Sequence, residues 1–232
     1  IMGISLVCIP AAVKRSQLCL KAVLMSGSAL CLWLLCRNGE LRFLPSLFLF
    51  AIFFEFLWDN IRSGKKDIGS DDREPVDKKD MPKEILLFII GIAAIIIGSR
   101  LLITYGSELA IILGVPAAIV GVTMVAIGTS LPDLVTTFTA IIKKEASMSV
   151  GNIIGANVID LTLILPVCSI VSGGGLKIAP QSYVLDMPVC FGMTLLAVVP
   201  PLITGRFRRW QGVAMLICYA AYVVVLVKYF GV

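Results

Sequence analysis

Long apolar runs separated by short polar turns make up most of the 232-residue chain. About 20 consecutive apolar residues are enough for a helix to cross the hydrocarbon core of a bilayer. Runs that reach or approach this length predict membrane-spanning helices at residues 18–36, 43–58, 85–103, 116–142, 147–171, 183–204 and 210–230. Residues 1–13 are also apolar, but they are too short to span and lack the features of a signal peptide. The pattern therefore predicts an all-α polytopic membrane protein.

Composition points to the same class of protein. Hydrophobic residues make up 58% of the chain and charged residues 15%, whereas soluble domains are about 45–50% apolar. The sequence has no histidine, so zinc centres and imidazole catalysis lack their usual donors. The seven cysteines lie mostly inside apolar runs and have no Cys-x-x-Cys spacing. They are interpreted as small buried hydrophobic residues rather than metal ligands or disulfide partners.

The distribution of basic residues predicts the orientation of the chain. The net charge of +5 does not indicate nucleic-acid binding, because the basic residues lie in loops between apolar runs. One side carries Lys14, Arg15, residues 59–84, Lys143, Lys144, Arg206, Arg208 and Arg209, and the other carries little beyond Arg37, Arg42 and Lys177. The first side is expected to be cytoplasmic and the C-terminus outside. We expect an integral protein of the plasma membrane, or of the inner membrane in a bacterium.

Residues 59–84 form the one substantial hydrophilic stretch. It mixes basic and acidic residues without an apolar pattern able to build a core, which predicts a solvated cytoplasmic linker. Its acids also lack the spacing of an EF-hand loop. The linker divides the chain into residues 1–58 and residues 85–232. Charged residues close to span ends are interpreted as interfacial, namely Glu55, Arg100, Glu108 and Asp186.

Two fragments each set one carboxylate inside an apolar run: Gly121-Val-Thr-Met-Val-Ala-Ile-Gly-Thr-Ser-Leu-Pro-Asp133 and Gly151-Asn-Ile-Ile-Gly-Ala-Asn-Val-Ile-Asp160. A polar turn, Lys143-Lys144-Glu145, separates them. Asp133 comes about a dozen residues before the turn and Asp160 about fifteen after it, so both lie roughly 20 Å from it at the rise of an α-helix. We therefore expect the two acids to face each other near the middle of the bilayer.

An ionised carboxylate at that depth is costly unless it is paired, hydrated or neutralised, which makes a cation site the leading hypothesis. The alternative is a pair of protonated or hydrogen-bonded acids that hold helices together. Pro132 removes a backbone donor and is expected to interrupt its helix, so carbonyl groups around Ala126 and Gly128 lose their partners. With the hydroxyl groups of Thr129 and Ser130 they offer the hard oxygen ligands that Ca²⁺ and Na⁺ prefer. A tolerated proline kink is the simpler alternative.

The second fragment also places polar groups on one helical face. Asn152, Ala156 and Asp160 fall at i, i+4 and i+8. Glycines at both ends of residues 151–155 give the spacing that lets another helix approach closely. The Asn157 amide lies beside this face, where it could contact a cation or make an interhelical hydrogen bond.

The pairing of Gly128-Thr-Ser-Leu-Pro-Asp133 with residues 151–160 resembles the second alpha repeat of the cation/calcium exchanger superfamily, which includes the sodium/calcium exchangers. Similarity extends over residues 85–232, including Arg209-Trp-Gln-Gly212. The resemblance implies a sodium/calcium-exchanger-like helix bundle with the second alpha repeat at about residues 116–171. Residues 1–58 would then be the tail of a first half, since that family has two inverted repeats and only one is found here.

In that family the alpha-repeat oxygens bind Ca²⁺ and Na⁺ alternately. The resemblance carries this role to Thr129, Ser130, Asp133, Asn157, Asp160 and the carbonyl group of Ala126. It implies transported Ca²⁺ and Na⁺, with K⁺ or H⁺ as alternative coupling ions, and no resident cofactor. Aspartate at position 133, where many sodium/calcium exchangers have glutamate, resembles the potassium-dependent branch. Ala156 replaces the usual serine and removes one hydroxyl ligand from a sodium site.

These observations predict a membrane transporter rather than an enzyme, a secondary antiporter that works by alternating access. Its partners would be the lipid bilayer, inorganic cations and a missing N-terminal repeat, supplied by the same longer chain or by a second subunit. A truncated scaffold that transports nothing is the main alternative. An intramembrane aspartyl protease is a remote one, because the sequence lacks the Gly-x-Gly-Asp and Pro-Ala-Leu motifs of such proteases.

Overall fold

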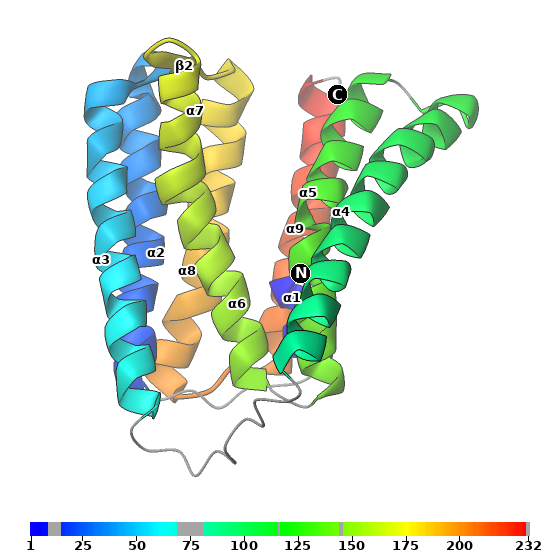
Figure 1. The fold of residues 1–232 in the computed structure, drawn as a ribbon. Coiled ribbons are helices and arrows are strands. Elements are labelled where there is room, and N and C mark those ends of the chain that lie inside the picture. The colour runs from blue at the N-terminus through cyan, green and yellow to red at the C-terminus, as the bar shows by residue number, and fades with distance from the viewer. Residues whose placement is uncertain (9–14, 69–80, 116, 144–145, 231–232) are drawn as a thin grey trace. The chain divides into compact units, whose positions relative to one another are not determined.

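The computed structural model describes residues 1–8, 15–68, 81–115, 117–143 and 146–230 (Figure 1). Its α-helices are α1 (Met2–Cys8), α2 (Arg15–Leu35), α3 (Phe43–Ile68), α4 (Met81–Ile112), α5 (Ala117–Ile142), α6 (Ala146–Ile159), α7 (Leu165–Val171), α8 (Met187–Thr204) and α9 (Arg209–Phe230). Short elements complete the chain: the 3₁₀ turn η1 (Cys36–Asn38), strands β1 (Glu40–Arg42) and β2 (Gly175–Lys177), and the π-helical turns η2 (Asp160–Ile164) and η3 (Ser182–Asp186).

Six helical stretches within the described ranges are long and apolar enough to cross a membrane. They are Leu18–Asn38, Phe43–Ser63, Met81–Ile112, Val150–Val171, Ser182–Thr204 and Arg209–Tyr229. A shorter apolar stretch, Ala126–Ile142, lies in α5. The prediction of an all-α polytopic membrane protein is confirmed, and the two three-residue strands are a local addition to it.

The helices around the predicted linker are longer than expected. α3 continues to Ile68 and α4 begins at Met81, so only residues 69–80 of the linker lie outside the described residues. The predicted end of the next span at residue 103 was wrong, because α4 reaches Ile112. The helix ends where Gly114 adopts a φ of 85°, a left-handed conformation that suits glycine. Arg100 and Glu108 therefore lie on the exposed surface of a continuous helix.

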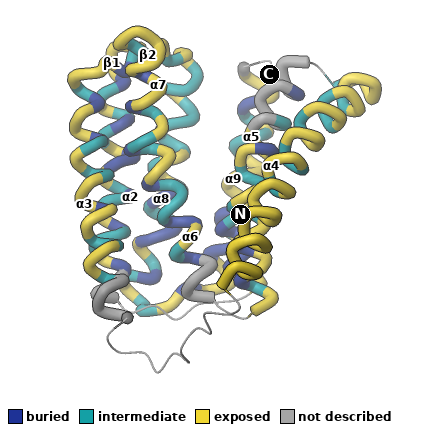
Figure 2. Tube along the Cα trace, viewed as in Figure 1, coloured by how far each residue is buried: buried dark blue, intermediate teal, exposed yellow. Residues whose placement is uncertain are grey.

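The chain divides into two compact units, residues 1–62 with 136–225 and residues 63–135 with 226–232. In the first unit, α2 packs along α8 and also contacts α6. Its largest core cluster joins α1, α2, α3, α6, α8 and α9, and includes the fully buried Leu6, Val158 and Phe207. In the second unit, none of the described residues of α4 is buried, as Figure 2 shows by its exposed colour.

A two-stranded antiparallel sheet ties two distant connections together at one end of the first unit. β1 pairs with β2 so that Glu40 lies opposite Lys177 and Leu41 opposite Leu176. Ser169 at the end of α7 adds a hydrogen bond from Oγ to the Leu41 carbonyl oxygen, 2.7 Å away. The turn after α2 and the turn after α7 are thereby fixed to each other, which places the ends of these two helices at the same end of the unit (Figure 1).

Each π-helical turn is followed directly by an α-helix whose second residue is a proline. Pro166 stands at the start of α7, after η2, and Pro188 stands at the start of α8, after η3. In an α-helix a proline ring clashes with the carbonyl group four residues earlier, and both of those carbonyl groups lie inside the π turns. The wider turn moves them away from the ring, so the prolines are accommodated without a break in either span.

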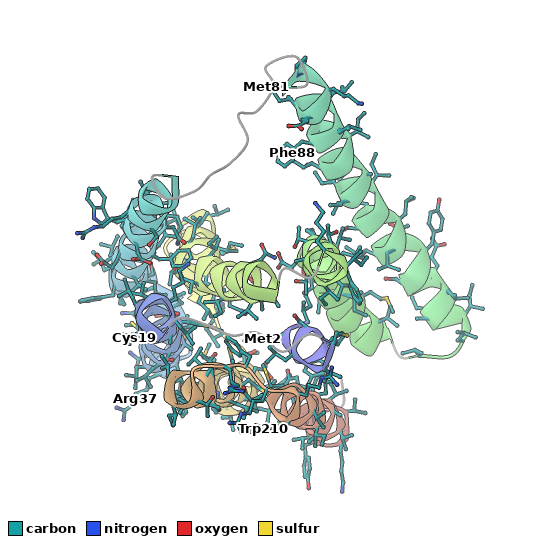
Figure 3. All side chains as sticks on the ribbon, turned by 90° about the horizontal axis from the view of Figure 1, so that it is seen from below. Met2, Cys19, Arg37, Met81, Phe88 and Trp210 are labelled. Atoms are coloured by element: carbon teal, nitrogen blue, oxygen red, sulfur yellow. The ribbon has the colours of Figure 1, made fainter. Side chains whose placement is uncertain are left out.

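α1 and α9 approach each other closely through glycine. A Cβ atom built on Gly212 would lie 2.6 Å from the Gly3 carbonyl oxygen and 2.9 Å from the Val7 nitrogen. Only a residue without a side chain fits between these backbones. Figure 3 shows Met2 of α1 beside the helix that carries Trp210.

The seven cysteines are free, and the interpretation that they are buried was wrong for most of them. Cys36 is buried, whereas Cys8, Cys19, Cys168, Cys190 and Cys218 are exposed and Cys31 is half-buried. The physical reason is that a helix in a membrane turns apolar side chains outward to lipid as well as inward, so an apolar run does not indicate burial in protein.

Candidate functional site

The first set of predicted ligands lies along one stripe of α5. Ala126, Thr129, Ser130 and Asp133 stand at i, i+3, i+4 and i+7 of a continuous helix. Thr129 is exposed, and Ser130 and Asp133 are half-buried. The Thr129 hydroxyl donates a hydrogen bond to the Ala126 carbonyl oxygen, 3.2 Å away. The stripe therefore carries a carbonyl, two hydroxyl groups and a carboxylate within two helical turns.

The expectation that Pro132 interrupts this helix was wrong. α5 runs unbroken from Ala117 to Ile142 with Pro132 inside it. The proline has no N–H to offer the carbonyl group of Gly128, but the bonds of the turns on either side hold the helix together. The simpler alternative, a proline accommodated within a continuous helix, is the one observed.

Gly128 has a second role, in packing. A Cβ atom at this position would lie 2.3 Å from the side chain of Ile103 and 3.6 Å from the carbonyl oxygen of Ser99, both on α4. The absence of a side chain lets α4 lie directly against α5 beside the ligand motif. Gly106 and Met124 make a similar close contact farther along the two helices.

The second set of predicted ligands lies on α6 and η2. Asn152, Ala156 and Asp160 share one face, as predicted from their spacing. Asn152 Nδ2 donates a hydrogen bond to Thr136 Oγ1 on α5, 2.8 Å away. Asn157 Nδ2 instead donates to the Ile153 carbonyl oxygen of its own helix, at 2.9 Å. One donor of the Asn157 amide is thus used within α6.

Asp160 is the first residue of the π-helical turn η2. The N–H group of Leu165, five residues later, bonds the carbonyl oxygen of Asp160. The Asp160 residue is exposed. Single π-helical turns inside α-helices occur often at functional sites, because they re-aim a side chain relative to the regular helix. The one local signal for this turn in the sequence is Pro166, which lies six residues after the acid.

Asp133 and Asp160 belong to different compact units, so the expectation that they face each other stays a prediction. Within the residues that the structure describes, no three histidine, cysteine, aspartate or glutamate side chains gather closely enough to hold a metal ion.

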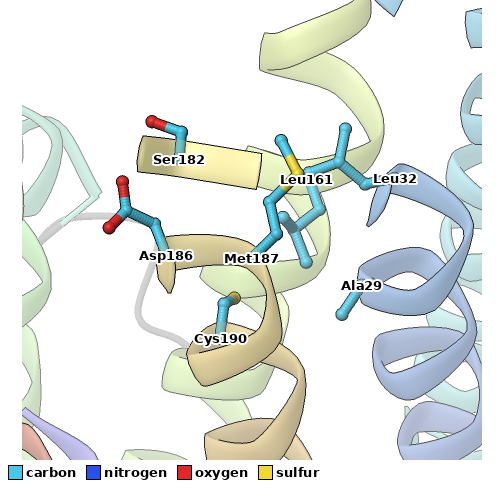
Figure 4. A pocket seen from close by; sticks show the side chains of 7 residues that line it. All are labelled: Ala29, Leu32, Leu161, Ser182, Asp186, Met187 and Cys190. Carbon is cyan, nitrogen blue, oxygen red and sulfur yellow. The ribbon is translucent and has the colours of Figure 1, made fainter. Parts of the chain in front are cut away.

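A third acid has a more specific environment than the sequence suggested. Asp186 ends the π turn η3, and its Oδ1 accepts a hydrogen bond from the Tyr222 hydroxyl of α9 at 3.0 Å. It lines a mainly apolar cavity of about 190 Å³ between α2, η2 and α8 (Figure 4). The other lining residues are Ala29, Leu32, Leu161, Ser182, Met187 and Cys190. Its interpretation as an interfacial residue did not anticipate this partner, because Tyr222 is distant in the sequence.

The fold and these two helices define a polytopic membrane protein with oxygen-bearing motifs inside apolar spans. The chain belongs to the sodium/calcium exchanger family, because the family described as "Sodium/calcium exchanger protein" matches residues 83–228. The resemblance inferred from the motifs is thereby confirmed.

Individual relatives agree with this assignment. The chain is 33% identical over 144 residues to the sodium/calcium exchanger MaX1 of Methanosarcina acetivorans, which covers 62% of this chain and 41% of that protein. It is 29% identical over 161 residues to the sodium/potassium/calcium exchanger Nckx30C of Drosophila melanogaster, covering 67% of this chain and 18% of that protein. The chain thus spans less than half the length of these relatives.

Solved structures show the same fold. A structure of the sodium-calcium exchanger NCX_Mj superimposes with a TM-score of 0.76 at 22% identity, covering 96% of this chain and 70% of that chain. The expected sodium/calcium-exchanger-like helix bundle is therefore confirmed.

Proposed function

We propose that the protein is a secondary active antiporter that exchanges Ca²⁺ for Na⁺ by alternating access, with K⁺ or H⁺ as alternative coupling ions. The observation that carries this proposal is the family match over residues 83–228, which contains both acidic motifs. Relatives named as sodium/calcium and sodium/potassium/calcium exchangers support it. A transporter of this kind holds its cation near the bilayer midplane and exposes it to each side in turn.

In this proposal Asp133 is the central Ca²⁺ ligand and Asp160 sets the coupling to the second cation. Thr129, Ser130 and the Ala126 carbonyl group share the stripe of α5 that carries Asp133. The Asn157 amide oxygen and the carboxylate of Asp160 add ligands from α6 and η2. Hard oxygen ligands of this type suit Ca²⁺ and Na⁺.

The hydrogen bond between Thr136 and Asn152 lies within the first unit and marks the faces of α5 and α6 that lead to the proposed ligands. Asp133 lies one helical turn from Thr136 on α5, and Asp160 lies about two turns from Asn152 along α6. Both acids therefore belong to the faces that carry this bond. Two carboxylates would balance the charge of Ca²⁺, which is the reason to prefer a divalent ion as cargo.

The proposal also includes a second half and an orientation. The remaining ligands would come from a matching repeat, in the same longer polypeptide or in a second subunit, because the chain spans 41% of its Methanosarcina acetivorans relative. The exposed Arg62 lies near the end of α3, Lys143 directly after α5, and Arg206, Arg208 and Arg209 in the connection from α8 to α9. The side of the membrane that holds these residues is proposed to be the cytoplasmic one.

Ion flux in proteoliposomes tests the proposal, using the protein expressed from its complete gene. Ca²⁺ uptake should depend on an outward gradient of Na⁺, K⁺ or H⁺. Asp133→Asn and Asp160→Asn should each lower the flux by about 100-fold or more, because each removes one of the two carboxylates proposed to balance the charge of Ca²⁺; a 100-fold loss corresponds to roughly 2.8 kcal/mol. Glu55→Gln, which neutralises an exposed acid in α3, is the matched control and should retain flux.

The outcomes separate the alternatives. If the unmodified protein showed no Ca²⁺-dependent counter-transport of any of the three ions, the antiporter assignment would be abandoned in favour of a scaffold. Equal loss in all three variants would remove the special role of the two aspartates. Cleavage of a membrane peptide that depends on both aspartates would instead indicate a protease.

A further inference from the structure

The turn between α8 and α9 presents three arginines to the outside. Arg206, Arg208 and Arg209 are all exposed, whereas Phe207 between them is only 1% exposed and belongs to the core of the first unit. The buried phenyl ring anchors the chain while its neighbours point outward. We call residues 205–210 the arginine turn.

Hydrogen bonds fix the backbone of the arginine turn. Gly205 closes α8 in a left-handed conformation with φ of 72°, and its N–H bonds the Pro201 carbonyl oxygen at 2.8 Å. The Thr204 hydroxyl lies 2.9 Å from the Arg206 carbonyl oxygen. Gln211, which is fully buried, accepts the Arg208 N–H at its Oε1 over 3.0 Å. The three guanidinium groups therefore extend from a structured segment.

No acidic residue of α8 or α9 neutralises the positive charge of this turn. Residues 187–232 contain no aspartate or glutamate. Within the described ranges, none of the three arginines makes an ion pair, in contrast to Arg42, which pairs with Glu40 at the sheet end. Lys143 and Arg62 are exposed at the same end of the first unit, and the N-terminus of α9 adds a partial positive charge. An anion that reached this turn would meet no opposing carboxylate on α8 or α9.

The place of the arginine turn along the chain indicates which kind of anion would reach it. It joins two apolar stretches of membrane-spanning length, Ser182–Thr204 and Arg209–Tyr229. Trp210 is 51% exposed at the start of the second stretch, and exposed tryptophan at a span end marks the level of the lipid headgroups. Figure 3 views the molecule from this end and labels Trp210.

We propose that the arginine turn is a binding site for the phosphate headgroup of an anionic phospholipid. Arginine suits this ligand because its planar fork donates two parallel hydrogen bonds to phosphate oxygens. Basic residues next to a span attract anionic lipid from the adjacent leaflet. The site is separate from the proposed cation ligands and does not depend on which ions the protein exchanges. Its lipid would hold the α8–α9 connection at the membrane surface.

Native mass spectrometry of the purified full chain in detergent tests this site. Phosphatidylglycerol should bind in preference to phosphatidylcholine with the same acyl chains. Arg206→Gln with Arg208→Gln should weaken phosphatidylglycerol binding by about tenfold or more, because each basic residue near the headgroups contributes separately. The matched control is Arg37→Gln with Lys177→Gln, which removes two exposed charges from the sheet end and should leave the affinity within about twofold.

Each other result counts against the site. Equal weakening in the two double variants would show a dependence on net charge alone. Full competition by millimolar inorganic phosphate would indicate a free-anion site rather than a lipid site. A measurement on the unmodified protein tests the site even if a variant does not fold. The preference for phosphatidylglycerol should fall steeply between about 0.05 and 0.5 M salt, because salt shortens the screening length. An unchanged preference would overturn the proposal.

Discussion

Asn152 on α6 donates a hydrogen bond from Nδ2 to Thr136 Oγ1 on α5, with 2.8 Å between the two atoms. Both residues belong to the first unit, Thr136 in the last part of α5 and Asn152 near the start of α6. Asn152 was predicted to share the face of Asp160, and Thr136 lies one turn from Asp133. The bond therefore joins the part of α5 that follows Asp133 to the helix that leads to Asp160.

A double-mutant cycle with Thr136→Val and Asn152→Ala measures the strength of this connection. We expect a coupling free energy of about 0.6 kcal/mol and no more than about 1.7 kcal/mol, the range of interhelical hydrogen bonds in membrane proteins. The measurement is the unfolding free energy of the detergent-solubilised protein. Additive single effects would mean that the two side chains are not bonded in the membrane.

Gly212→Ala should destabilise the protein by separating α1 from α9. The added methyl group would lie 2.6 Å from the Gly3 carbonyl oxygen and 2.9 Å from the Val7 nitrogen, and backbone atoms cannot move aside as a flexible side chain can. Overpacking of this kind costs about 1–3 kcal/mol. The matched control is Gly192→Ala on α8, where a Cβ atom meets nothing within 4 Å.

The thermal midpoint of unfolding distinguishes these two glycine variants. It should fall for Gly212→Ala, and it should stay level or rise slightly for Gly192→Ala, because alanine is the better helix former by about 1 kcal/mol. A similar decrease in both variants would contradict the close approach of α1 and α9.

The Gln211 side chain supplies a hydrogen-bond donor that Pro200 lacks. Pro200 has no N–H to donate to the carbonyl oxygen of Leu196 four residues earlier, and Gln211 Nε2 donates to that oxygen instead, at 3.2 Å. Gln211→Leu should cost about 1–3 kcal/mol, because it leaves buried polar groups without partners. Part of this cost should disappear in a Pro200→Ala background, where the restored N–H reaches the same carbonyl oxygen.

Pro201→Ala is the control for this prediction, because its restored N–H would serve Ala197 and not Leu196. Unfolding free energies of the single and double variants give the two coupling terms. Only the pair of Gln211 and Pro200 should be coupled. Equal coupling of Gln211 to both prolines would contradict the proposed compensation.

The sequence predicted the helices better than their ends. Hydropathy located the spans because lipid requires about 20 apolar residues from a helix. It placed the end of α4 at residue 103, since charged Arg100 and Glu108 break the apolar run, yet a helix ends where the backbone turns, which occurs at Gly114. Similarly, Pro132 predicted a break that the neighbouring turns of α5 prevent.

The candidate site was predictable where it depends on spacing along one helix. Periodicity placed Asn152, Ala156 and Asp160 on one face, and the family match supports the motif that contains them. Contacts between distant segments were not predictable. The Tyr222 hydroxyl meets Asp186, and Gln211 meets Leu196, only after the helices pack. Nothing local in the sequence specifies such pairs.

The last prediction concerns the departure of α6 from the family motif. Ala156 is half-buried and lies one turn before Asp160 on the same face, where the resemblance places a serine hydroxyl in relatives. If the proposed cation site is correct, Ala156→Ser adds one hard oxygen ligand. The Na⁺ concentration that gives half-maximal Ca²⁺ exchange should then fall, by about threefold to tenfold for a single neutral ligand worth roughly 1 kcal/mol.

Sodium titrations of Ca²⁺ flux in proteoliposomes measure this change. Ala214→Ser, a half-buried alanine on α9 outside both motifs, controls for the general effect of a hydroxyl group in a span and should leave the half-maximal Na⁺ concentration unchanged. An unchanged value in Ala156→Ser would place this position outside the sodium coordination shell. In that case Asp160 would act on the coupling ion without Ala156, and the proposed ligands from α6 and η2 would remain Asn157 and Asp160.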